Sequence, residues 1–202
     1  MSGQFNFFIS IWLKFIFLFT PFFAISMFLT MTGGYSEKQR RLLALQVTLA
    51  VGVICFILFF YGTNVFQLLG INLDAFRIGS GALLFLSAVS LMQHKAAFPP
   101  PADDDDIAVV PLALPIIVGP ATIGTLLVLG AEISGKAQKT AGLLALLAAT
   151  VSIGILLQLA ALIERLLGKK LMTTLSKITG LVLSALAAQM IFTGIVNFLK
   201  IV

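Results

Sequence analysis

The chain has 202 residues, of which 59% are hydrophobic and only 10% are charged. Soluble domains carry about 25% charged residues, so this composition excludes an ordinary water-soluble protein and indicates a membrane protein. The formal net charge of +5 would favour nucleic-acid binding in a soluble protein. Here the basic residues lie in short loops beside apolar segments, where they orient a chain in the bilayer. We therefore expect a lipid bilayer, and no nucleic acid, around the chain.

Six apolar segments follow one another along the chain. A bilayer core of about 30 Å is crossed by roughly 20 apolar residues in a helix, whereas strands of a membrane barrel alternate apolar with polar residues. The segments are apolar on every face, so the sequence predicts an all-α membrane protein with six transmembrane helices. The predicted spans are 7–31, 42–63, 75–93, 107–130, 140–163 and 177–199.

Basic residues are distributed unevenly between the two ends of these spans. With the N-terminus outside, eight of them lie in the loops after spans one, three and five, and five lie on the other side. Cytoplasmic loops carry an excess of Lys and Arg. We therefore expect both termini outside. The first span has no basic region before it and no small-residue cleavage site after it, so we expect it to be retained.

The longest connection divides the chain into two halves. Residues 94–106 contain three consecutive prolines and four consecutive aspartates, a composition typical of a stiff, solvated linker. The flanking parts, 1–93 and 107–202, then hold three spans each within one membrane domain. Because three is an odd number, any repeat of the two halves must be inverted. Weak similarities at shifts of 99 and 100 residues favour such a 3+3 inverted repeat.

Two prolines lie near the centres of spans one and four. An interior proline removes a backbone donor and clashes with the preceding turn, at a cost of about 3 kcal/mol. Thr20 before Pro21, and Gly119 before Pro120, have the order of an N-cap followed by proline at the first helical position. We therefore expect both spans to be broken near the bilayer midplane. The alternative is that each proline only kinks a packed helix.

Broken membrane helices are tolerated where they line a polar cavity or are buried in protein, and their N-termini attract anionic groups such as a carboxylate. The candidate binding residues lie at these breaks or in the turns that follow them, where hydroxyl groups are frequent. Such hydroxyls often bond their own helix backbone, so each is weak evidence alone. The predicted substrate-binding residues are Thr20, Pro21, Ser26, Gly119, Pro120, Thr122 and Thr125.

Every acidic residue lies at a span end or in a loop. Proton relays and metal transporters place carboxylate, His or thiolate groups within the membrane, so this pattern favours a small solute that is neutral overall, such as a zwitterion. We expect no catalytic residues, no metal ligands and no cofactor. A coupling ion, H⁺ or Na⁺, would have to use backbone carbonyl or hydroxyl oxygens.

Three other polar features have simpler structural interpretations. Asp74 and Arg77 are expected to pair on the first turn of span three, as an anchor rather than a substrate clamp. Lys14 is expected to extend its ammonium group towards the outer surface. Gln189 is expected to be an interhelical hydrogen-bond partner.

Two stretches of the sequence resemble the MarC family, a six-span neutral amino-acid transporter family. The first is DIAVVPLALPIIVGPATI at residues 106–123, and the second comprises LGI at 69–71 and FRIGSG at 76–81. The resemblance covers essentially the whole chain. It implies an inverted 3+3 fold, a bacterial or archaeal plasma (inner) membrane, and transport of small neutral amino acids.

Four positions depart from the family pattern. Where the family usually has Asn-Pro, then a glycine and a later proline, this chain has Thr20, Phe23 and Ser26. Ala121 replaces a glycine of the family's usual Gly-Pro-Gly-Ala. Loss of glycine narrows the space for close backbone approach, so these departures bear on the substrate more than on the fold.

Two other function classes compete with a transporter. A passive channel or a membrane scaffold would share the same spans, because a sequence does not display alternating access. An intramembrane hydrolase would need a nucleophile and a base, which Ser80 and His94 would have to supply. These two residues are separated by about 21 Å along one helix, beyond hydrogen-bond reach. Small residues for close helix packing explain Ser80 and its flanking glycines better.

Overall fold

The computed structural model describes residues 2–93, 108–133 and 135–201, and all secondary structure in these ranges is helical. The helices are α1 Ser2–Leu18, α2 Pro21–Met31, α3 Glu37–Leu69, α4 Leu73–Gln93, η1 Ala108–Ile117, α5 Pro120–Glu132, α6 Lys136–Gln158 and α7 Ala160–Ile201. By length and composition, the described chain has five helical segments able to cross a membrane, and α5 is a shorter apolar helix. The predicted all-α membrane class is confirmed. The predicted linker, 94–106, lies outside the described residues.

The fourth predicted span, 107–130, differs from a single long helix. Its first part is η1, a π-helix, and its second part belongs to α5. Pro111 and Pro115 lie in η1 and lack the N–H groups that an α-helix would need there. The Val118 N–H donates to the Ala113 carbonyl oxygen five residues back, which is the bond of a π-turn. Two prolines within one helical segment therefore account for its wider winding.

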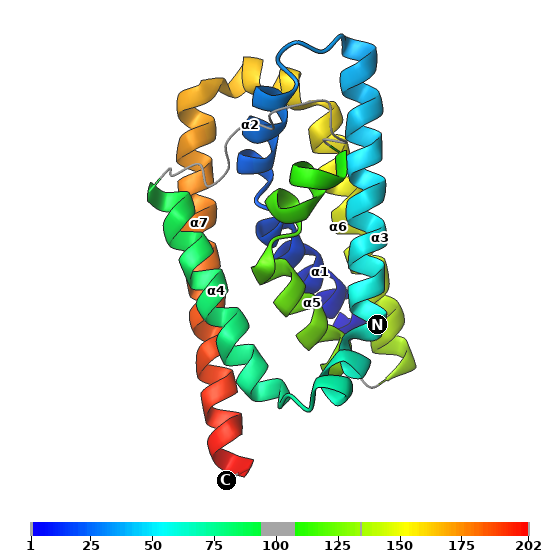
Figure 1. Ribbon diagram of the computed structural model, residues 1–202, viewed down its shortest axis with the longest axis vertical. Coiled ribbons are helices and arrows are strands. Elements are labelled where there is room, and N and C mark those ends of the chain that lie inside the picture. Colours follow the sequence, from blue (N-terminus) through cyan, green and yellow to red (C-terminus); the bar gives the residue numbers. More distant parts are fainter. Residues whose placement is uncertain (1, 94–107, 134, 202) are drawn as a thin grey trace.

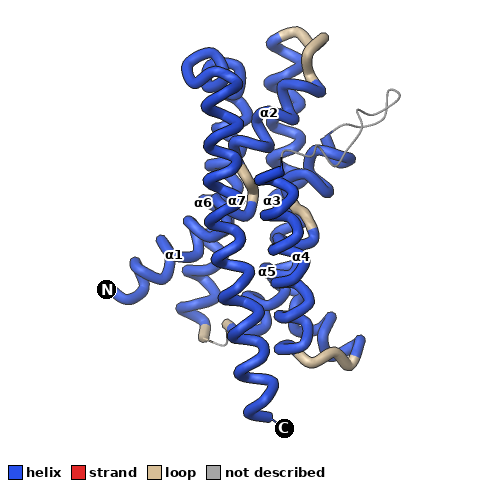
Figure 2. The backbone as a smooth tube through the Cα atoms, turned by 90° about the vertical axis from the view of Figure 1, so that its left-hand side faces the viewer, coloured by secondary structure: helices blue, strands red, loops and turns tan. Residues whose placement is uncertain are grey.

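The helices pack in three layers (Figure 1). One outer layer is the pair α4 and α7, at the left of Figure 1, and the other is the pair α3 and α6, at the right. The middle layer consists of α1, α2, η1 and α5. In it, α1 packs against α6, α2 against α7, and α5 against both α3 and α4. Figure 2 shows the same bundle turned by 90°, with α7 running along its length.

Burial follows these layers. Phe15 and Phe19 of the middle layer are fully buried, whereas Leu49, Leu86 and Leu181 on the outer pairs are each at least 60% exposed. Large exposed apolar side chains on every outer helix are unfavourable in water and favourable against lipid tails. The outer surface is therefore that of a protein surrounded by a bilayer.

Residue chemistry explains several helix ends. Ser36 caps α3 in a reciprocal capping box with Gln39, and Gly70 ends the same helix with a left-handed φ of 62°. α7 contains Gly168 with φ 74° and ψ 157°, so two helices meet there at a kink. These positive φ values are inexpensive for glycine.

Small residues allow the outer helices α4 and α7 to approach closely. A Cβ atom on Gly194 would lie 2.9 Å from the Asp74 carbonyl oxygen, and one on Gly180 would lie 3.0 Å from the Ala88 carbonyl oxygen. Ser80 of α4 packs against Gly124 of α5 so closely that a Cβ on that glycine would overlap its hydroxyl. Close packing by small residues is the usual way in which membrane helices associate.

Gly194→Ala tests this contact. The added methyl has no room against the Asp74 carbonyl and the Ile78 side chain, so we expect a loss of about 1–3 kcal/mol in the free energy of unfolding. In detergent micelles this should lower the thermal unfolding midpoint by about 2 °C or more. The matched control is Gly79→Ala on α4, where a Cβ meets nothing within 4 Å. An equal midpoint for the two variants would contradict the packing argument.

Candidate functional site

The chain between α1 and α2 turns at Thr20. This residue has φ 46° and ψ 61°, and it is the one described residue other than glycine with a positive φ. The left-handed region is unfavourable for a β-branched side chain, so the surrounding packing holds the turn against its local preference. The Thr20 carbonyl oxygen accepts from the Ala24 N–H at 2.9 Å. Pro21, which is buried, is the first residue of α2.

The chain between η1 and α5 is extended at Gly119, with φ −79° and ψ 175°. The Gly119 carbonyl oxygen accepts from the Ile123 N–H at 3.0 Å. Pro120 is the first residue of α5 and is exposed. Helices α2 and α5 thus both begin with proline, and the N–H groups that follow in the first turn have no acceptor within their own helix.

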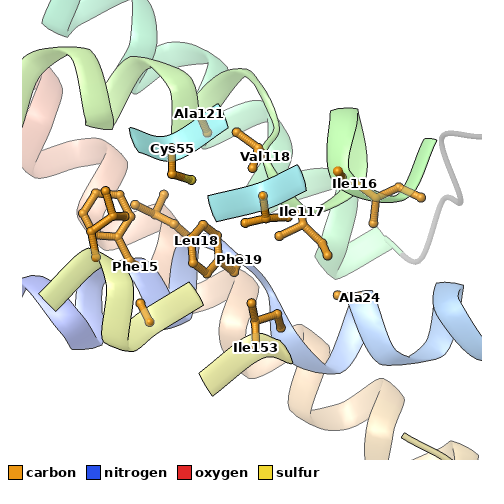
Figure 3. Packing of buried hydrophobic residues seen from close by; sticks show 14 of the residues in the cluster. Phe15, Leu18, Phe19, Ala24, Cys55, Ile116, Ile117, Val118, Ala121 and Ile153 are labelled. Atoms are coloured by element: carbon orange, nitrogen blue, oxygen red, sulfur yellow. The ribbon is translucent and has the colours of Figure 1, made fainter. Parts of the chain in front are cut away.

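The two interruptions lie side by side. Thr122 Oγ1 is 3.5 Å from the carbonyl oxygen of Leu18, the last residue of α1, and 3.5 Å from that of Ile117, the last residue of η1. Figure 3 shows Leu18 and Phe19 next to Ile117 and Val118 in the buried core. One hydroxyl group therefore connects the ends of two helices that are far apart in the sequence.

The remaining predicted site residues differ in their surroundings. Ser26 donates its hydroxyl to the Phe22 carbonyl oxygen at 3.0 Å, within its own helix. Thr125 donates to the Ala121 carbonyl oxygen at 2.9 Å, and its hydroxyl lies 3.6 Å from Met190 Sδ on α7. Of the seven predicted residues, Thr125 is the one that lines the cavity between α1, α4, α5 and α7.

This cavity has a volume of about 210 Å³. A water molecule takes about 30 Å³ in the liquid, so a small organic solute has room there. Leu18 lines the cavity, and its carbonyl oxygen is the one near Thr122, so the cavity reaches the interruption of α1. The polar side chains of the lining are Lys14, Arg77, Thr125, Glu132, Gln189 and Thr193.

A charged network lies at one side of the cavity. The Arg77 side chain is only 5% exposed; its Nη1 is 2.8 Å from Asp74 Oδ1, and its Nη2 pairs with Glu132 Oε1. Asn197 Nδ2 on α7 lies 3.4 Å from Asp74 Oδ1. The expected pair of Asp74 and Arg77 on α4 is present, and it extends to α5 and α7. Arg77 therefore joins α4 to α5, and Asp74 joins the pair to α7.

The sequence did not assign Lys14, Glu132 or Gln189 to a common site. The structure places all three on the cavity lining, although they come from α1, α5 and α7. Lys14 is half-buried and takes part in none of the ion pairs between described residues. A charged residue within an apolar span often indicates a functional site. Lys14 lies within the first predicted span, so the sequence alone could have identified it as a candidate.

The family model described as "MarC family integral membrane protein" matches residues 5–199. The chain belongs to the MarC family. Similar MarC relatives include the UPF0056 membrane protein of Aquifex aeolicus, 28% identical over 201 residues, with 96% of this chain and 94% of the relative covered. UPF0056 membrane protein MJ1677 of Methanocaldococcus jannaschii is 33% identical over 186 residues, with 87% of this chain and 89% of the relative covered.

UPF0056 membrane protein YhcE of Escherichia coli is 31% identical over 186 residues, with 88% of this chain and 86% of the relative covered. This MarC chain is therefore a multi-pass membrane protein with bacterial and archaeal homologues. No solved structure gives a significant match. Among the described residues, no group of three or more His, Cys, Asp or Glu side chains is placed to hold a metal ion.

Thr20→Asn tests the strained turn. Asparagine tolerates the left-handed region better than threonine, whose cost there is about 1–2 kcal/mol. We expect a higher thermal unfolding midpoint for this variant in detergent micelles. Thr30→Asn on the exposed, right-handed part of α2 is the matched control and should give no increase. A fall in the Thr20→Asn midpoint would show that the turn prefers threonine.

Asp74→Ala tests the anchor. Removal of one partner from a buried charge network costs about 3–5 kcal/mol, because it leaves a buried charge uncompensated. We therefore expect a much lower thermal unfolding midpoint in detergent micelles. Glu37→Ala removes an ion pair with Arg41 whose side chains are 88% and 72% exposed, and it should cost less than about 1 kcal/mol. Similar losses in the two variants would show that Asp74 is not part of an energetically important network.

Proposed function

We propose that this protein is a secondary transporter of small neutral amino acids or similar zwitterions that works by alternating access. In this proposal, spans one and four are broken near the bilayer midplane, and two inverted halves, 1–93 and 107–202, rock about the broken spans. The observation that carries the proposal is the meeting of two helix interruptions beside a polar cavity, inside a bundle with an apolar outer surface.

The packing of the helices supports an inverted repeat. α1 packs on α6 and η1 on α3; α2 packs on α6 and α5 on α3; α2 packs on α7 and α5 on α4. In an inverted repeat, α1 corresponds to η1, α2 to α5, α3 to α6 and α4 to α7. If the two halves are exchanged in this way, the first contact of each pair becomes the second. The contacts of α3 with α6, and of α4 with α7, are each converted into themselves. A two-fold axis in the membrane plane would produce this reciprocity.

The chemistry of the interruptions supports a solute with a carboxylate group. The first turns of α2 and α5 present N–H groups and the positive ends of helix dipoles. The proposed substrate-binding residues are Thr20, Pro21, Ser26, Gly119, Pro120, Thr122 and Thr125. The proposed coupling ion is H⁺ or Na⁺. The proposed location is the plasma (inner) membrane, as the family resemblance implies, and the excess of basic residues on one side supports both termini outside.

The competing functions differ in what they require. A passive channel or a scaffold would give no saturable flux. An intramembrane hydrolase would need an accessible nucleophile, but Ser80 is 4% exposed and packs tightly against Gly124. His94 lies outside the described residues. The tight packing of Ser80 therefore disfavours a hydrolase.

Replacement of either proline tests the carrier. Pro21→Ala and Pro120→Ala restore the backbone donor and so permit a continuous helix, in whose interior proline would cost about 3 kcal/mol. We expect uptake of labelled alanine into proteoliposomes to fall at least about tenfold in each variant. The parental protein should show saturable uptake that unlabelled alanine competes.

Ser87→Ala is the matched control, because the exposed Ser87 hydroxyl donates only to the Leu83 carbonyl oxygen of its own helix. Membrane insertion of all variants is checked by yield and by monodisperse elution in detergent. Parental uptake rates in both proline variants would refute the role of the interruptions. Non-saturable flux through the parental protein would indicate a channel instead.

A further inference from the structure

The cavity between α1, α4, α5 and α7 contains a balanced set of charges. Lys14, Arg77 and Glu132 line it, and Asp74 pairs with Arg77 behind the lining. The formal charges of these four groups cancel. In the low dielectric of a helix bundle, these groups can bind a solute at low electrostatic cost only when the net charge of the groups and the solute together stays close to zero.

Arg77 has little capacity left for a solute. One of its terminal nitrogens is engaged by Asp74 and the other by Glu132, and the side chain is almost fully buried. Its role is therefore to hold Glu132 in place at the cavity.

Lys14 is the free cation of the set. No ion pair or hydrogen bond of its ammonium group is formed with any described residue, although the residue is half-buried on an apolar helix. An ammonium group within a membrane span faces a partner or a water-filled cavity, because burial in hydrocarbon is expensive. Lys14 lines the cavity, so this space is where water or an anionic group can solvate its ammonium group.

Glu132 offers the complementary group. Its Oε1 pairs with Arg77, and its side chain remains 45% exposed. The second oxygen, Oε2, makes no hydrogen bond or ion pair with the described part of the chain. A carboxylate with one oxygen fixed and one free is well placed to accept hydrogen bonds from an ammonium group.

We propose that Lys14 and Glu132 form the two poles of a binding site for a small zwitterion. Lys14 Nζ binds the carboxylate of the solute, and Glu132 Oε2 binds its ammonium group. This position in the cavity is distinct from the first turns of α2 and α5, which do not line it. Leu18 and Leu84, which also line the cavity, contact the apolar part of the solute. A zwitterion leaves the sum of charges at zero, whereas a simple carboxylate or amine does not. As a statement about the transported substrate this inference rests on the proposed function, but binding is measured without flux.

The test is equilibrium binding to the purified full chain in lipid nanodiscs, with labelled alanine and labelled propionate as probes. The parental protein should bind alanine more tightly than propionate. Lys14→Met should weaken the binding of both probes at least about tenfold, because each loses a charge-assisted hydrogen bond. Glu132→Gln should weaken alanine binding and strengthen propionate binding, because the carboxylate that repels propionate is gone.

Two further variants separate recognition from folding. Lys14→Arg keeps the cation and should retain the binding of both probes. Lys139→Met removes an exposed lysine outside the cavity and should leave binding unchanged. Parental affinity for alanine in Lys14→Met, or displacement of alanine by an equal concentration of chloride, would overturn the site. So would the absence of saturable binding of alanine to the parental protein.

The two proposals fail separately. Loss of alanine binding in Lys14→Met, with no flux through the parental protein, would support the site and refute the transporter. Parental binding in Lys14→Met, with flux abolished in Pro21→Ala and Pro120→Ala, would refute the site and support the transporter.

Discussion

Every backbone N–H and C=O group of a protein surrounded by lipid must find its partner within the protein. A helix satisfies this requirement along its length but not at its ends. The interruptions between α1 and α2 and between η1 and α5 therefore need enclosure, and the three-layer packing provides it. The outer helices α3, α4, α6 and α7 flank the middle layer, in which Phe15, Phe19 and Val118 are fully buried.

Polar groups follow the same requirement. Asp74, Arg77 and Glu132 come from two helices of different halves, and each would be costly alone in hydrocarbon. Joined in one network, they hold the start of α4 against the end of α5. Arg77 and Glu132 of this network also line the cavity.

Local chemistry made much of the fold predictable. The apolar segments gave the membrane class, and the positions of Pro21 and Pro120 coincide with the first residues of α2 and α5. The π-helix of η1 was not predictable, because two prolines can be accommodated by a kink, a break or a wider winding. The left-handed conformation of Thr20 contradicts its own preference and is imposed by tertiary packing.

The cavity was beyond prediction for a different reason. Lys14, Arg77, Glu132 and Gln189 come from four helices, and their spacing in the sequence carries no signal that they converge. When each helix is considered alone, a separate structural role is the simplest interpretation of each of these residues. Of the predicted site residues, Thr125 alone lines the cavity.

The glycine contacts between α4 and α7 have a mechanical consequence. At Gly180 and Gly194 the two helices approach so closely that not even a methyl group fits between them, which leaves little room for sliding. Helices α4 and α7 are therefore expected to move together as one rigid body. Any change of shape in the bundle must then be taken up where the main chain is already released from helical hydrogen bonding, around Thr20, Gly119 and the bend at Gly168.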